Sequence, residues 1–264
     1  MSYVEIPVWR LGLAALLVVI AIVLSRVARL GLGKDLGLGA VRAAVQLVAI
    51  GYALRLLMNT NHPVAVMLVV IAMWGVAALT STRRLQHGPP ARVLFPHAFA
   101  AIGLGAFVAF APVLLFVVPH RPWFDARFVI PIGGMMLSSA MNVVAQVFER
   151  LFASAATDEA LLEQMLALGA TPQQALASHV RAALRAALIP TINGLVTVGL
   201  VALPGMMTGQ ILGGVAPEQA VRYQIVIMYQ LVAVAAVAGY AAAAFARRLI
   251  FTEDAQLRSW PADR

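Results

Sequence analysis

Long apolar runs between short polar connections constrain this chain of 264 residues more than any other feature. A helix needs about 20 residues to cross the apolar core of a bilayer, which is roughly 30 Å thick. Runs close to that length occupy 8–24, 36–58, 64–79, 94–118, 129–147, 189–212 and 225–246. The chain is 62% hydrophobic and 11% charged, with a mean hydropathy of +0.88, which is outside the range of soluble domains. The sequence predicts an all-α polytopic membrane protein with about seven transmembrane helices.

Two of the seven runs leave the number of spans open. The run 64–79 is short, and the run 129–147 contains Ser138, Ser139 and Asn142 among its apolar residues. Six spans with one re-entrant segment therefore remain an alternative. No stretch has the composition of a flexible linker, so we expect residues 1–264 to form a single transmembrane domain.

The basic residues predict the orientation in the membrane, because cytoplasmic connections hold the excess of Lys and Arg. One set of alternating connections, with the C-terminal tail, carries most of them: Arg26, Arg29, Lys34, Arg83, Arg84, Arg92, Arg150, Arg181, Arg185, Arg247, Arg248, Arg258 and Arg264. The opposite connections carry fewer: Arg10, Arg55, Arg121, Arg127 and Arg222. We therefore expect a multi-pass protein among the lipids of a bacterial inner (plasma) membrane, with its N-terminus outside and its C-terminus in the cytosol. The net charge of +8 is spread over these short clusters, which argues against nucleic-acid binding.

Residues 150–188, between the fifth and sixth runs, predict a cytosolic helical hairpin. Thr157 can cap a first helix, and Gly169 suits the end of that helix. Thr171 can cap the second helix, with Pro172 at its first position, where a missing N–H leaves no helical bond unmade.

The second helix of this hairpin is expected to continue into the run 189–212. It places Ser178, Arg181 and Arg185 on one side. Force applied at the turn would then reach a transmembrane helix. A hairpin that lies on the lipid headgroups is the alternative reading of the same pattern.

Arg42 lies further inside an apolar run than any other charged residue, and Gln46 lies one helical turn further along the same face. Charged groups at membrane depth mark functional sites by default. Arg42 is near the predicted cytosolic end of its span, so it is a candidate for the translocation path, with a snorkelling arginine or a polar contact between helices as the alternatives.

A second candidate for the path is a polar stripe in the fifth run. Met135, Ser138, Ser139 and Asn142 follow the spacing i, i+3, i+4 and i+7, which places them on one face of a helix. Such a face suits the lining of a path for a metal or a metal complex, and helix packing through small residues and methionine is the alternative.

The sixth run is interrupted by Pro204 and Gly205, which predict a kink or an unwound turn in that span. Together with Met206, Met207 and Gln210 they are the candidate gate, because broken helices at mid-membrane often form gates or substrate sites.

Several short segments resemble the FetB-type (UPF0014) family, the membrane subunits of ABC transporters linked to iron export and related to plant aluminium-resistance half-transporters. They are Leu168-Gly-Ala-Thr-Pro172, Arg185-Ala-Ala-Leu-Ile-Pro-Thr191, Thr197-Val-Gly-Leu-Val201, Leu203-Pro-Gly-Met-Met207 and Tyr223-Gln-Ile225, with Arg42, Gln46, Gly51-Tyr52 and Ile130-Pro-Ile132 upstream. The resemblance implies a permease that forms a homodimer and binds a soluble ABC ATPase subunit. It implies an ATPase-coupling set on the hairpin: Glu163, Gly169, Ala170, Thr171, Pro172, Arg181 and Arg185. Glu163 lies six residues before Gly169, which is roughly the spacing between the Glu and the Gly in the coupling loop of ABC importer permeases.

The chain contains no G-x-x-x-x-G-K-[ST] phosphate-binding loop. We therefore expect no enzymatic activity and no cofactor in this chain, with ATP and Mg bound by the separate ATPase. The leading prediction is the permease subunit of an ABC transporter that exports iron or another metal. A self-contained secondary carrier or channel for a metal or small solute is the alternative, although none of the 11 acidic residues lies deep in a run. A lipid-modifying enzyme would need a catalytic set at membrane depth that the runs lack.

Overall fold

The computed structural model describes residues 7–60, 62–83, 85, 88–113 and 122–258. The described residues form nine helices: α1 (Val8–Val27), α2 (Gly33–Thr60), α3 (Pro63–Thr82), α4 (Ala91–Pro112), α5 (Ala126–Thr157), α6 (Glu159–Ala167), α7 (Pro172–Thr197), α8 (Gly205–Leu212) and α9 (Pro217–Ile250). Six of them, α1 to α5 and α9, are long and apolar enough to cross a membrane. This confirms the prediction of an all-α polytopic membrane protein.

Internal contacts divide the chain into two compact units, Met1–Thr60 and Asn61–Arg264. The first unit is a helical hairpin of α1 and α2. A Cβ atom at Gly33 or Gly37 would lie 3.6 Å from the side chain of Ile22, an ordinary van der Waals distance, so α1 and α2 pack against each other along this face. The expectation of one transmembrane domain over the whole chain stays a prediction.

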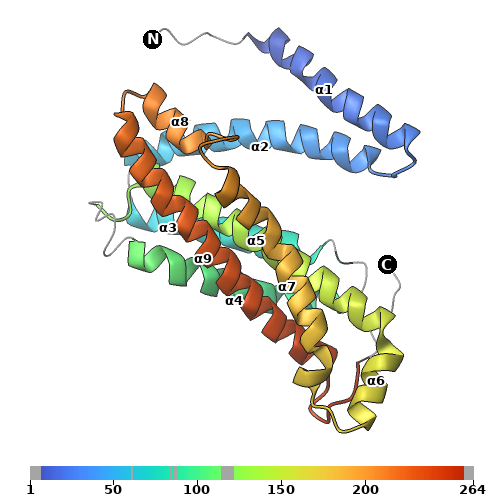
Figure 1. The fold of residues 1–264 in the computed structure, drawn as a ribbon. Helices are drawn as coiled ribbons and strands as arrows, with labels where there is room; N and C mark the ends of the chain where they lie inside the picture. Colours follow the sequence, from blue (N-terminus) through green and yellow to red (C-terminus); the bar gives the residue numbers. More distant parts are fainter. Residues whose placement is uncertain (1–6, 61, 84, 86–87, 114–121, 259–264) are drawn as a thin grey trace. The chain divides into compact units, whose positions relative to one another are not determined.

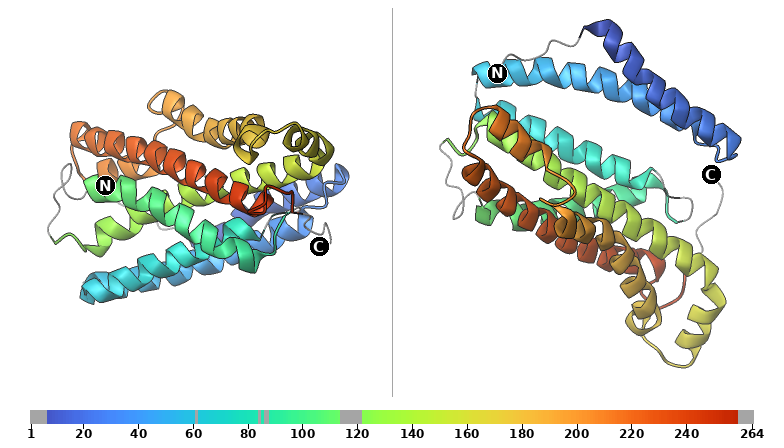
Figure 2. Two further views of the ribbon diagram at one scale, coloured as in Figure 1. Left: turned by 90° about the horizontal axis from the view of Figure 1, so that it is seen from below. Right: turned by 45° about the horizontal axis from the view of Figure 1, so that its top comes forward.

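In the second unit the long helices run alternately in opposite directions (Figures 1 and 2). The 34-residue α9 packs against α4, α5, α7 and α8, and α3 packs against α4 and α5. The core between them contains fully buried Leu94, Ile102, Val144 and Phe148. Small residues bring α4 and α9 together, with Ala98, Ala101, Ala235 and Ala242 fully buried. These contacts follow from the residues themselves, because small side chains let membrane helices approach closely.

One end of this unit gathers three connections that are far apart in sequence. A Cβ atom at Gly88, in the connection between α3 and α4, would lie 2.8 Å from the ring of Phe152 near the end of α5. Phe152 and Phe251, which follows α9, belong to the same buried cluster. The α6–α7 turn lies at this end as well (Figure 1). These are three of the connections in which the sequence concentrates its arginines.

The predicted sixth span is not a single helix. Within 189–212 the chain leaves the helix after Thr197, passes through a non-helical segment and re-enters a helix at Gly205. Gly199 has a φ of +83°, and its N–H donates to the carbonyl of Ala202, which closes a tight turn. Pro204 begins α8 instead of kinking a longer helix. An unwound segment was predicted here, but it starts at Val198, six residues before the proline.

The other predicted spans coincide with helices that extend beyond the apolar runs. The run 129–147 lies inside α5, which has 32 residues, and the run 225–246 lies inside α9. The last part of the run 94–118, residues 114–118, lies outside the described residues, as do Arg84, Arg121 and Arg264.

Candidate functional site: the helical hairpin and the polar face of α5

The turn between α6 and α7 is fixed by backbone and side-chain hydrogen bonds at both helix ends. The N–H of Gly169 donates to the carbonyl of Leu166 at 2.9 Å, and the N–H of Ala170 donates to the carbonyl of Met165 at 3.0 Å. This pair of bonds is a Schellman motif, which needs a left-handed residue, and Gly169 has a φ of +89°. The predicted role of Gly169 as the end of the first helix is confirmed.

The second helix begins with a capping box. The N–H of Gln174 donates to Oγ1 of Thr171 at 3.3 Å, and the N–H of Thr171 donates to Oε1 of Gln174 at 2.8 Å. Pro172 occupies the first helical turn, as predicted. The helix then continues without a break to Thr197, past the internal Pro190. The turn is therefore joined rigidly to a helix of 26 residues.

The start of α6 differs from the prediction. Thr157 is the last residue of α5, and its hydroxyl donates to the carbonyl of Ala153 at 2.9 Å instead of capping α6. Asp158 occupies the cap position, without a side-chain bond to the helix. Its carboxylate instead lies 2.8 Å from Nε2 of His179 on α7, which ties the two arms of the hairpin together.

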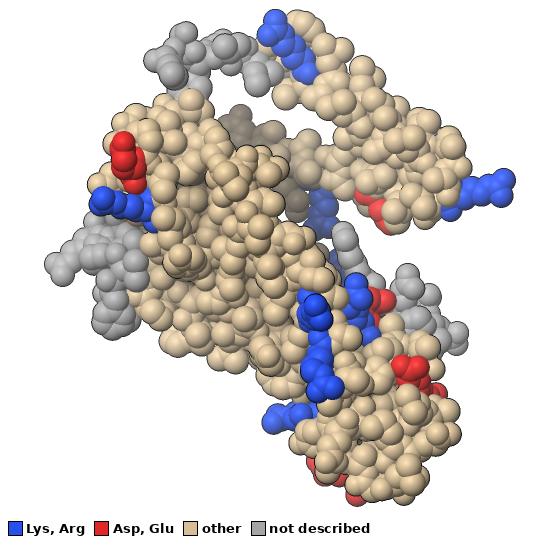
Figure 3. Space-filling model, in the orientation of Figure 1, with Lys and Arg blue, Asp and Glu red and all other residues tan. Residues whose placement is uncertain are grey.

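The hairpin presents its predicted coupling residues to the outside. Leu162 and Leu176 are fully buried in the hydrophobic core, so they anchor both arms. Glu163, Arg181 and Arg185 are exposed. Figure 3 shows Lys and Arg side chains gathered on the second unit beside the lobe that carries α6. The result is a rigid, charged projection.

The polar stripe of α5 faces a cavity of about 680 Å³. Met135, Ser138, Ser139 and Asn142 all line it, so the structure brings the four predicted stripe residues to one wall. The opposite walls are built from α7 and α9 and include Pro190, Thr191, Gly194, Met228 and Leu231. The lining holds hydroxyl, amide and thioether groups and no ionisable side chain.

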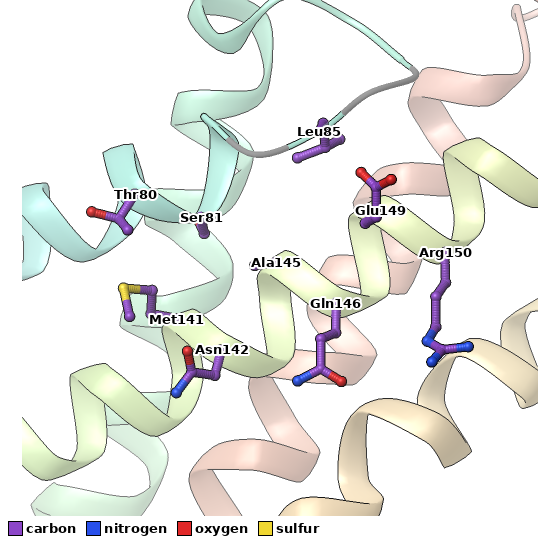
Figure 4. A pocket seen from close by; sticks show the side chains of 9 residues that line it. All are labelled: Thr80, Ser81, Leu85, Met141, Asn142, Ala145, Gln146, Glu149 and Arg150. Atoms are coloured by element: carbon purple, nitrogen blue, oxygen red, sulfur yellow. The ribbon is translucent and has the colours of Figure 1, made fainter. Parts of the chain in front are cut away.

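A second cavity, of about 560 Å³, lies toward the hairpin end of α5 (Figure 4). Thr80, Ser81 and Met141 contribute to it, together with Glu149 and Arg150. Asn142 and Gln146 line both cavities.

The stripe predicted from the sequence ended at Asn142, but the polar face of α5 is longer. Gln146, Glu149 and Arg150 continue the stripe at 11, 14 and 15 residues after Met135, all within one face of a helix with 3.6 residues per turn. Extending the same spacing to the end of the apolar run and beyond would have found them.

The candidate gate lies elsewhere in the second unit. Pro204, Gly205, Met206, Met207 and Gln210 belong to the start and body of α8, which packs on α9. None of them lines either of the two cavities described above. Their role as a gate stays a prediction.

Arg42 and Gln46 are on α2, in the first unit, and both side chains are exposed. Their role in the translocation path stays a prediction. The described residues also contain no group of three or more His, Asp or Glu side chains able to hold a metal ion.

Six apolar helices long enough to cross a membrane, together with a face of neutral polar groups on α5, define a polytopic helical membrane protein. The chain belongs to the uncharacterised protein family UPF0014, whose model matches residues 8–251. The resemblance found in the sequence is thereby confirmed.

Named relatives extend over nearly the whole chain. It is 35% identical to a UPF0014 membrane protein of Synechocystis sp., over 94% of both chains. It is 35% identical to the probable iron export permease protein FetB of Escherichia coli, over 94% of this chain and 93% of that protein. It is 33% identical to the protein ALUMINUM SENSITIVE 3 of Arabidopsis thaliana, over 93% of this chain and 88% of that protein. No solved structure matches the chain.

Proposed function

We propose that this protein is the transmembrane permease subunit of an ABC transporter that exports iron or another metal. The observation that carries the proposal is the rigid α6–α7 hairpin, whose turn is fixed at both helix ends and whose second arm continues as one helix to Thr197. A soluble ATPase that binds such a hairpin can transmit the conformational change of the ATPase to the helices around the polar cavity. The name of the relative in Escherichia coli supports metal export.

The proposal places the hairpin and the C-terminus in the cytosol of a bacterial inner membrane, with the N-terminus outside. Glu163, Ala170, Arg181 and Arg185 are the contacts expected for the ATPase, around the corner formed by Gly169. The permease acts as a homodimer, and ATP and Mg are bound by the partner ATPase, since the chain has no phosphate-binding loop. The polar face of α5 serves as the path for the cargo.

Two matched glycine variants test the coupling. Gly169 and Gly214 each follow a helix in a left-handed conformation, with φ of +89° and +93°, and a Cβ atom would meet nothing within 4 Å at either position. Valine at either site therefore imposes a similar backbone strain, but only Gly169 belongs to the hairpin. We expect the detergent-purified protein to co-elute with a soluble P-loop ATPase. The Gly169→Val variant should lose at least about 90% of the co-eluting ATPase, and the Gly214→Val variant should retain it.

Thermal unfolding of the two variants provides the control for folding. Equal ATPase retention by both variants, at matched stability, would contradict the role of the hairpin. A lone chain that moves metal across liposomes without ATP would contradict the ABC assignment and favour a self-contained carrier or channel.

A further inference from the structure

Asn142 and Gln146 hold a position that no other residue pair in the described part of α5 shares. Both line the 680 Å³ cavity and the 560 Å³ cavity, so their side chains are the wall common to the two. Figure 4 shows both amides leaving α5 on the same side, whereas Glu149 points toward Leu85. Any solute that moves along this face of α5 between the two cavities must pass these amides.

Neither amide is used to hold the helices together. Among the described residues, the side chains of Asn142 and Gln146 make no hydrogen bond, although Asn and Gln in membrane helices ordinarily bond across helix interfaces. A polar group without a partner at membrane depth is costly unless it faces water or a ligand. Asn142 is exposed and Gln146 is half-buried in the single chain, so both amides are accessible to a solute in the cavities.

The donors from Ser138 to Gln146 are neutral and evenly spaced, and Glu149 and Arg150 follow them only in the smaller cavity. Ser138, Asn142 and Gln146 follow one another at intervals of four residues, about 6 Å apart along the helix. Carbonyl and hydroxyl oxygens can replace the water around a cation, and without a carboxylate they hold it weakly enough to release it. Met135 and Met228 add thioether sulfurs, which are ligands for soft metal ions, to the larger cavity.

We propose that Asn142 and Gln146 form the junction of one continuous cation path, in which their side-chain carbonyls pass a metal ion between the two cavities. The metal cargo rests on the proposed function, whereas the continuity of the path rests on the cavities alone. The junction determines specificity, because an ion that neutral oxygens cannot partly dehydrate does not cross it.

The absence of cysteine from the chain allows a direct test of continuity. Single cysteines replace Glu149, Gln146, Asn142 and Ser138, and a charged, membrane-impermeant thiosulfonate is added from the hairpin side of sealed vesicles. We expect all four to react, with rates that fall from Glu149→Cys to Ser138→Cys. Val144→Cys and Val147→Cys, on the fully buried side of the same helix, should remain unmodified. A reactive Glu149→Cys beside unreactive Gln146→Cys and Asn142→Cys would overturn the path.

Anaerobic titration of the purified protein with Fe(II) alone tests the cargo. Asn142→Leu and Gln146→Leu should each weaken Fe(II) binding about tenfold, the change expected for one lost contact to a charged group. Gln164→Leu makes the same chemical change on exposed α6 and should bind as the wild type does. Equal binding by all four proteins, or none by the wild type, would overturn the metal junction. Neither measurement uses the ATPase, so failure of the ABC assignment would be seen separately, as absent co-elution.

Discussion

His179 on α7 lies against Asp158, the residue between α5 and α6, with Nε2 of the imidazole 2.8 Å from Oδ2 of the carboxylate. The contact closes the hairpin at the end opposite its turn. The hydroxyl of Ser178 lies 3.3 Å from Nδ1 of the same ring, so both ring nitrogens have partners. The hairpin is thus held at its base as well as at its tip.

We predict that His179 and Asp158 are energetically coupled. Alanine at either position should weaken the hairpin, and a double-mutant cycle should give a coupling of about 0.5–1.5 kcal/mol. The value is modest because Asp158 is 44% exposed and solvent screens part of the interaction. Hydrogen exchange of the α6 amides measures the local opening free energy. Additive effects of the two substitutions would show that the contact contributes nothing.

The capping box at Thr171 supports a second prediction. Thr171→Ala removes the acceptor for the N–H of Gln174 and should lower the local stability of the start of α7 by about 1 kcal/mol. Thr171→Ser keeps the hydroxyl and should retain most of the local stability of the start of α7. Faster hydrogen exchange at Gln174 in the alanine variant alone would confirm the assignment, and equal exchange in both variants would contradict it.

The close approach of α4 and α9 supports a third prediction. A Cβ atom at Gly105 would lie 2.8 Å from Cβ of Ala238 and 2.9 Å from the carbonyl oxygen of Val234, and the backbone of α9 cannot yield easily. Gly105→Ala should therefore destabilise the protein by about 1–3 kcal/mol, measured by thermal unfolding in detergent.

Gly75, inside α3, provides the matched control for Gly105. A Cβ atom there would meet nothing within 4 Å. Gly75→Ala should be neutral or slightly stabilising, since alanine favours the helix over glycine. A loss of stability at Gly75 equal to that at Gly105 would refute the packing argument.

Local signals predicted the hairpin well because its geometry is encoded in adjacent residues. Gly169 tolerates the left-handed conformation, Thr171 caps a helix and Pro172 suits a first helical position, and the structure uses all three as predicted. The prediction of Thr157 as the cap of α6 was wrong, because α5 extends to this residue. Where a long helix ends depends on tertiary packing. Asp158 contacts His179, which is 21 residues away, and a contact over that separation cannot be predicted from the sequence.

The membrane region was predicted in outline and missed in two details. Residues 189–212 are mostly apolar, and hydropathy does not distinguish a continuous helix from two helices joined by the turn at Gly199. The stripe of α5 was placed on one face correctly from its spacing. The cavity walls from α7 and α9 could not be predicted, because they require the packing of three helices.

A buried amide on α9 gives the last prediction. Gln230 is 4% exposed, its Nε2 donates to the carbonyl of Ala109 at only 3.4 Å, and its Oε1 has no partner among the described residues. Gln230→Leu removes the unpaired acceptor at similar volume and should leave the free energy of unfolding unchanged or raise it by about 1 kcal/mol. Gln230→Glu places a charge in the same apolar site and should lower it by about 3 kcal/mol or more at neutral pH. Thermal unfolding in detergent compares the two. A leucine variant as unstable as the glutamate variant would mean that the weak bond to Ala109 is worth more than its length suggests, and that α4 and α9 depend on it.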